Sequence, residues 1–221
     1  MLADIRLYQL ISPTLPVGGF TYSQGLEWAV EAQWVHDKAT LKQWLQGLLA
    51  QSIGTLELPI LLRLQQALTQ GDEVAFTSWC NYLLASRETA ELRKEEQQRG
   101  AALARLLPNL DITIPVNLSR SVAGTQLAGM ALAAHCWEIA AEKTCAGYTW
   151  SWLENIVMAG VKLIPLGQTH GQQILLELGS DIPQALAAAQ HLPDDEIGSS
   201  TPALAIASSR HESQYTRLFR S

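Results

Sequence analysis

The chain has 221 residues, of which 48% are hydrophobic, enough to bury a core in one domain or two small ones. Its formal net charge of −6 argues against non-specific nucleic-acid binding, which needs clustered positive charge. No run of about 18 uncharged apolar residues appears, and the first residues lack the layout of a secretion signal, so we expect no membrane association. Three cysteines without close spacing favour a reducing, cytoplasmic setting over a disulfide framework.

Helical periodicity dominates the first half of the chain. Pro59 is expected to open a helix that runs to about Gln70, and Gly71 and Asp72 are typical of a helix stop followed by an N-cap. Another helix is expected to follow Asp72. Before Pro59, residues 41–53 predict an amphipathic helix with one apolar face formed by Leu41, Trp44, Leu45, Leu48 and Leu49.

Residues 87–107 predict a long helix whose first half is dense in charge, which indicates a solvated or partner-facing surface. Within it, Glu95 and Arg99 have the favourable i, i+4 order. Residues 108–119 are expected to form a loop, because Pro115 interrupts the only strand-like run. The alanine- and glycine-rich residues 120–145 predict one central, buried helix.

Four further helices are expected over residues 148–165, from about Gln168, over 181–192 with Asp181 as cap, and from about Pro202. Strand patterns are nearly absent. The sequence therefore predicts an all-α protein with a single orthogonal helical-bundle domain of roughly ten helices over residues 1–207. Residues 208–221 are predicted to form a C-terminal partner-binding tail.

The sequence lacks the motifs that several kinds of chemistry require. There is no nucleotide-binding P-loop motif, no G-x-S-x-G elbow and no C-x-x-C pair. The five histidines are scattered along the chain. We therefore expect no catalysis, no cofactor and no metal site within one chain, although a metal site shared between subunits stays open.

The stretch "LPVGGFTYSQGLE", residues 15–27, combines prolines, which favour extended backbone before them, with a glycine pair that permits positive φ. One interpretation is a structural turn into a helix that runs through Glu27. The other is a shaped contact surface on which Phe20 and Tyr22 are exposed for a partner.

Lys162 is the only formal charge between Asn155 and Leu176, on a helix face opposite the tryptophan stripe. It either extends to solvent along its apolar stem or lines an internal route or contact surface.

The final stretch, "SSRHESQYTRLFRS", ends in arginines and aromatics, both enriched at protein interfaces. If it is helical, one face carries Arg210, Gln214, Arg217 and Arg220, and another carries His211, Tyr215, Leu218 and Phe219. We expect this tail to dock onto a partner.

Four separated blocks together resemble the UreF family of urease accessory proteins. They are "SPTLPVGGFTYSQGLEWAVE", "RETAELRKEEQQRGAAL", "WSWLENIVMAGVKLIPLGQTHGQ" and "RHESQYTRLFRS". The resemblance covers essentially the whole chain, and the order of the blocks makes it specific.

This resemblance implies an all-α, homodimeric, non-enzymatic chaperone that bridges the accessory protein UreD, also called UreH, and the GTPase UreG. The assembly delivers nickel to apo-urease, which it reaches through UreD. A direct GTPase activator that supplies Arg210, Arg217 or Arg220 in trans is an alternative, and a nickel-binding metallochaperone is another.

The resemblance also implies site residues. Phe20 matches the aromatic after the glycine pair, and Arg217 matches the tail arginine. In the family, the tail becomes ordered on binding UreD and packs near the glycine-turn aromatic. Glu27 and Lys162 lie in the matching blocks. The full set of expected partner-binding residues is Phe20, Tyr22, Glu27, Lys162, Arg210, Gln214, Tyr215, Arg217, Phe219 and Arg220.

Overall fold

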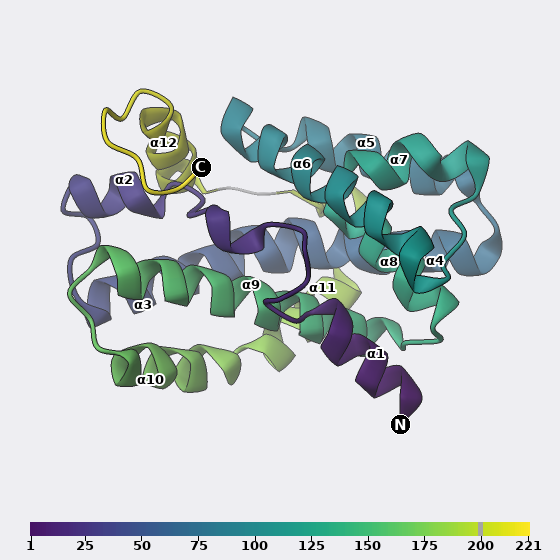
Figure 1. The fold of residues 1–221 in the computed structure, drawn as a ribbon, viewed down its shortest axis with the longest axis horizontal. Coiled ribbons are helices and arrows are strands. Elements are labelled where there is room, and N and C mark those ends of the chain that lie inside the picture. Colours follow the sequence, from purple (N-terminus) through teal and green to yellow (C-terminus); the bar gives the residue numbers. More distant parts are fainter. Residues whose placement is uncertain (199–200) are drawn as a thin grey trace.

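A computed structural model describes residues 1–198 and 201–221 and shows an all-α fold, which confirms the predicted class (Figure 1). No β-strand occurs among these residues. The α-helices are α1 (Leu2–Leu10), α2 (Leu26–Glu31), α3 (Lys38–Leu48), α4 (Leu58–Gln70), α5 (Glu73–Ala85), α6 (Ala90–Leu106), α7 (Ser119–Gly124), α8 (Gln126–Cys136), α9 (Ala141–Leu163), α10 (Gln168–Gly179), α11 (Ile182–His191) and α12 (Pro202–His211).

Helix α9 is the long central element, and it packs against α1, α2, α4, α8, α10 and α11. In Figure 1, α2 and α12 lie together at one end of the molecule, and α1 lies along its lower edge, away from them. Small residues on α9 permit close packing: a Cβ added to Gly160 would lie 2.6 Å from Leu41 Cδ2 of α3. One hydrophobic cluster extends through the fold and includes Phe219 of the tail.

Helices α3 and α4 are joined without a break by a π-helical segment, Leu49–Glu57. The sequence predicted that Pro59 opens a separate helix, and this is wrong. Pro59 lies at the start of α4, inside a longer continuous helix. A proline has no amide to donate to the preceding turn. The carbonyl of Thr55, four residues before it, instead accepts a hydrogen bond from the backbone amide of Gly198 at 3.0 Å.

The continuous helix Lys38–Gln70 has 33 residues and is long and apolar enough to span a membrane. However, 67% of its most apolar window is buried inside the protein. Such burial is typical of the core helix of a globular domain.

The prediction of a single helix over residues 120–145 is wrong. The chain leaves the helical conformation at Thr125, between α7 and α8, and turns again after Cys136 before α9 begins. Thr125 adopts extended φ and ψ, and its hydroxyl accepts the amide of Ala128 as a helix N-cap. Gly100 of α6 makes room for this break, because a Cβ there would lie 2.7 Å from the Thr125 backbone.

Most of the other boundaries follow the local sequence signals. Gly71 ends α4 in the left-handed conformation, and the Asp72 carboxylate accepts the Ala75 amide at 2.8 Å, as expected. The cap expected at Asp181 is not formed by its side chain, which instead accepts a long hydrogen bond from Gln46. Residues 108–119 are irregular, with short 3₁₀ turns. Helix α1 was not expected.

Candidate partner-binding site

The C-terminal tail folds back onto the protein. Helix α12 ends at His211, and residues 212–221 return along α2 and α6 (Figure 1). The prediction that the tail is helical, with two distinct faces, is therefore wrong beyond His211. The predicted boundary at residue 208 lies inside α12, where the hydroxyl of Ser208 pairs with that of Thr89 at 2.7 Å.

The carboxylate of Glu27 explains this turn of the tail. It accepts the backbone amides of Leu218 at 2.6 Å and Phe219 at 2.9 Å. Residues 212–221 are not helical, so the amides of Leu218 and Phe219 have no partner in a preceding helical turn and are free to donate to this carboxylate. Glu27 is buried and lies in the first turn of α2, where the positive end of the helix dipole favours a negative charge.

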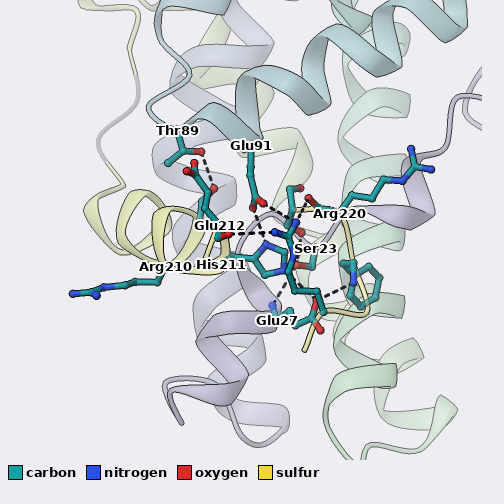
Figure 2. Close-up of polar contacts among 12 residues, drawn as sticks. Ser23, Glu27, Thr89, Glu91, Arg210, His211, Glu212 and Arg220 are labelled. Atoms are coloured by element: carbon teal, nitrogen blue, oxygen red, sulfur yellow. Dashed lines mark hydrogen bonds and ion pairs between the residues drawn. The ribbon is translucent and has the colours of Figure 1, made fainter. Parts of the chain in front are cut away.

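His211 links Glu27 to a second carboxylate (Figure 2). Its Nε2 lies 3.2 Å from Glu27 Oε2, and its Nδ1 lies 2.7 Å from Glu91 Oε2 on α6. The other oxygen of Glu91 pairs with the guanidinium of Arg217 at 2.8 Å. We call Glu27, Glu91, His211 and Arg217 the tail clasp.

A second set of contacts holds the end of the tail. The Ser221 carbonyl accepts the amide of Ser23 at 2.6 Å and its hydroxyl at 2.5 Å, and the Ser221 hydroxyl donates to Glu95. Glu95 also accepts from Gln24, whose other side-chain atom accepts from the indole of Trp152 on α9. Gln24 has a φ of 52°, which a non-glycine residue rarely adopts.

Glycines in the turn permit two close approaches. Gly25 has a φ of 78°, and a Cβ there would lie 2.8 Å from the backbone nitrogen of Ser208, so α12 could not pack as it does. A Cβ on Gly19 would lie 3.1 Å from Asn155 Nδ2 of α9. The turn is therefore a structural support for the tail as well as a surface.

The prediction that Tyr22 is exposed is wrong. It is only 4% exposed, because the tail covers it, and its hydroxyl donates to Gln98 of α6 at 2.7 Å. Burial raises the pKa of the Tyr22 hydroxyl, while a hydrogen bond with Arg220 acts in the opposite direction. Phe219 is also buried. Between the tail and α6 remains a cleft of about 450 Å³ lined by Tyr22, Glu91, Lys94, Glu95, Gln98, Arg217, Phe219 and Arg220.

Other expected residues face outwards from the turn and the folded tail. Phe20 is 60% exposed and Leu218 is 65% exposed, and Tyr215 is fully exposed. Arg210 and Arg220 are exposed as well, and Figure 2 shows Arg210 directed away from the clasp. The turn and the tail thus expose both apolar and cationic side chains.

Lys162 and Gln214 are the remaining two expected residues. Lys162 is exposed near the end of α9, and it makes no ion pair with any residue that the structure describes. Gln214 is half-buried, and its Oε1 has no hydrogen-bond partner within residues 1–198 and 201–221.

The charged start of α6, expected to be solvated or partner-facing, is only partly exposed: Arg93 and Lys94 face solvent, whereas Glu95 and Glu96 are buried. The Glu95–Arg99 pair forms as predicted, at 2.9 Å, but Glu95 is buried under the tail. Arg87, just before α6, is buried. Its guanidinium pairs with the carboxylate of Glu57 at 2.5 Å and with that of Glu96 on α6 at 2.7 Å. Charges that appear solvated in sequence therefore form two buried ion clusters.

No group of three or more histidine, cysteine or acidic side chains in the described part of the chain is arranged to hold a metal ion. Of the histidines, His211 is the only one that is buried, and both of its ring nitrogens are already occupied by carboxylates.

Comparison with known proteins identifies the family. The UreF family model matches residues 35–179. A urease accessory protein UreF from Pseudomonas putida is 54% identical over 221 residues, covering 100% of this chain and 98% of the relative. This chain belongs to the UreF family. The proteins of the same name from Alcanivorax borkumensis, at 52% identity, and Klebsiella pneumoniae, at 49%, cover 99% and 98% of this chain and 98% and 97% of their own lengths.

The UreF family model leaves out both the glycine turn and the tail, whereas the full-length relatives include them. Glu27 and Arg217 were predicted from the sequence as partner-binding residues, and in the structure they contact the chain's own tail and α6. The roles of Glu91, His211 and Ser23 in holding the tail were not predicted. Glu91 appeared as one of many charges on α6. No local pattern could pair it with a histidine 120 positions away.

Proposed function

We propose that this chain is a urease accessory protein that supports nickel insertion into apo-urease without being an enzyme itself. In this proposal it is a cytoplasmic homodimer that bridges UreD, also called UreH, and the GTPase UreG, and reaches apo-urease through UreD. It would bind neither nucleic acid nor membrane. Full-length similarity to proteins named urease accessory protein UreF supports the proposal.

The observation that carries the docking part of the proposal is the surface presented by the turn and the folded tail. Phe20, Tyr215 and Leu218 are exposed there, and aromatic side chains are enriched in protein interfaces. Glu27 already fixes the backbone at Leu218 and Phe219. A fixed surface loses less conformational entropy on association than a free tail.

Co-purification tests the proposal. A tagged chain, co-expressed with UreD and UreG, is expected to retain both. Tyr215→Ala combined with Leu218→Ala should lose UreD, because it removes two exposed side chains from the surface. Val74→Ala combined with Val116→Ala is the matched control, since both valines are exposed on other helices or turns. Equal retention by both double variants would exclude the tail as the docking surface.

Arg210 favours the alternative of a direct GTPase activator. Its guanidinium is exposed and has no ion-pair partner among the described residues, as an arginine supplied in trans requires. GTP hydrolysis by UreG, measured with the wild-type chain and with Arg210→Gln, tests this. Stimulation that Arg210→Gln abolishes would support activation, and no stimulation by either chain would exclude it.

A nickel-binding metallochaperone remains the third proposal. Equilibrium dialysis of the isolated chain against Ni²⁺ tests it. Because the histidines other than His211 are dispersed over the surface, tight binding at one nickel per chain is not expected.

A further inference from the structure

The cleft between the folded tail and α6 contains carboxylates that already have partners inside the protein. Both oxygens of Glu91 are occupied, one by the His211 ring at 2.7 Å and the other by the Arg217 guanidinium at 2.8 Å (Figure 2). Glu95 pairs with Arg99 at 2.9 Å and accepts further hydrogen bonds from the glycine turn and from the end of the tail. The acidic groups of the cleft therefore serve to hold the chain together.

The hydrogen-bond donors of the same cleft are not used in this way. Lys94 is exposed on α6 and makes neither an ion pair nor a hydrogen bond within residues 1–198 and 201–221. Gln98 lies one turn further along α6. Its side-chain oxygen accepts the Tyr22 hydroxyl, but its amide nitrogen has no acceptor in the described part of the chain. The guanidinium of Arg220 donates to the Tyr22 hydroxyl, a neutral partner, and forms no ion pair among the described residues.

The charges that line the cleft do not balance. Arg217 and Arg99 offset the carboxylates of Glu91 and Glu95, whereas the positive charges of Lys94 and Arg220 remain without a counter-charge. This local excess contrasts with the formal net charge of −6 of the whole chain. A ligand that complements the cleft is therefore an anion whose oxygens accept hydrogen bonds.

The size and the walls of the cleft restrict the kind of anion. Its volume of about 450 Å³ lies within the range of about 300–1,000 Å³ that is typical of ligand pockets. Tyr22 and Phe219 line it, so an apolar part of the ligand can lie against aromatic rings. Because Glu91 and Glu95 line it too, a doubly charged phosphate meets more repulsion than a singly charged carboxylate. These properties fit a short peptide segment that carries aspartate or glutamate.

We propose that this cleft is a binding site for an acidic peptide segment of a partner protein, whose carboxylates bind Lys94, Gln98 and Arg220. The site is a property of the chain itself. Only the identity of the partner that supplies the segment rests on the function proposed above.

Closure of the tail builds this site. Phe219 and Arg220 belong to the tail, whereas Lys94 and Gln98 belong to α6, so a ligand that bridges them binds only when the tail is closed. A ligand that binds one state stabilises that state by mass action. A bound acidic segment should therefore hold the tail in place, and a fixed tail should raise the affinity for the segment.

NMR titration of the full, ¹⁵N-labelled chain tests the proposal. The probes are the tripeptide Asp-Glu-Asp with acetylated and amidated ends, its neutral counterpart Asn-Gln-Asn, and inorganic phosphate. We expect the acidic peptide to shift the backbone amides of Gln98, Phe219 and Arg220. Equal shifts with the neutral peptide, or no shift with the acidic one, would overturn the proposal. Tighter binding of phosphate than of the acidic peptide would overturn it too, because the cleft would then select phosphate groups.

Lys94→Gln and Arg220→Gln each remove one unpaired cation and keep a polar side chain. We expect each to weaken binding of the acidic peptide about tenfold, as the loss of one charged hydrogen bond requires, and Lys94→Arg to retain most of the affinity. Lys162→Gln is the matched control, since it removes the same charge from an exposed lysine on α9. Equal weakening by Lys94→Gln and Lys162→Gln would overturn the proposal, because net charge and not the cleft would then attract the peptide.

Amide exchange at Leu218 and Phe219 measures the coupling between the ligand and the tail. The acidic peptide should slow the exchange of both amides. Glu27→Gln should weaken peptide binding although Glu27 does not line the cleft, and Glu31→Gln, an exposed change on the same helix, should not. Exchange that the peptide leaves unchanged would overturn the proposal, because the ligand would then not bridge the tail and α6.

The outcomes distinguish this proposal from the function proposed above. If the acidic peptide binds as expected but the tagged chain retains neither UreD nor UreG, the proposed function fails and the binding site stands. If the chain retains both proteins but the peptide does not bind, the binding site fails and the proposed function stands.

Discussion

Oε2 of Glu27 lies 2.9 Å from the backbone nitrogen of Phe219, a residue 192 positions later in the chain. The same carboxylate accepts the amide of Leu218 through its other oxygen. One side chain on α2 therefore fixes the path of the tail, and it does so through backbone groups that a side-chain substitution in the tail cannot remove.

We expect Glu27→Gln to loosen the tail without unfolding the core. Glutamine has one acceptor oxygen, so the amide of Leu218 or Phe219 loses its partner, at a cost of about 1–3 kcal/mol. Amide exchange at both positions should accelerate. Glu31→Gln, an exposed change on the same helix, is the control and should leave both amides protected. Equal exchange in the two variants would contradict the assigned role of Glu27.

Gly25→Ala should destabilise the packing of α12. The left-handed backbone costs an alanine about 1–2 kcal/mol, and the new Cβ would also lie 2.8 Å from the Ser208 nitrogen. Gly71→Ala is the matched control, since Gly71 has a φ of 69° but no atom within 4 Å of an added Cβ. Urea unfolding should show a larger loss for Gly25→Ala. The steric argument fails if the two losses are the same.

Arg87→Met should reduce the free energy of unfolding by about 3–5 kcal/mol, because it leaves the buried carboxylates of Glu57 and Glu96 without their cation. Arg120→Met, on the exposed side of α7, is the control. Chemical denaturation measures both. A loss below about 1 kcal/mol for Arg87→Met would show that the inner ion cluster contributes little.

Cys136 should be the only cysteine that iodoacetamide modifies in the folded protein. Burial raises the pKa of Cys80 and Cys145 to about 12, so at about pH 8 roughly one in ten thousand of either is the reactive thiolate. Cys136 is exposed, although partial burial raises its pKa too. Mass spectrometry should find one modification in native protein and all three cysteines modified in denaturant. Rapid native labelling of Cys145 would contradict the packing around α9.

The parts of the fold that the sequence predicts are those determined by neighbouring residues. Gly71 and Asp72 mark the end of α4 and the start of α5 because a left-handed stop and a carboxylate cap act within one turn. The start of α12 also follows from a local signal, because Pro202 lies at the first position of the helix, where its missing amide is not needed.

The failures come from contacts between distant segments. The break at Thr125 depends on Gly100 of α6, and the uninterrupted passage through Pro59 depends on the amide of Gly198. Both partners are far away in sequence. The composition of the tail predicted that Arg210, Tyr215 and Arg220 are exposed. The burial of Tyr22 and Phe219 could be known only once the tail was placed over the protein.

The contacts that hold the tail join residues 22–27, which leave the ribosome early, to residues 208–221, which leave it late. During synthesis, Glu27 has no amides to accept until positions 218 and 219 emerge. Any companion that recognises the closed tail thereby distinguishes a copy in which residues 218 and 219 have been made and folded back from a shorter nascent one. The tail contacts would thus restrict assembly to copies in which the carboxylate of Glu27 has bound its two amides, because these groups lie far apart along the chain.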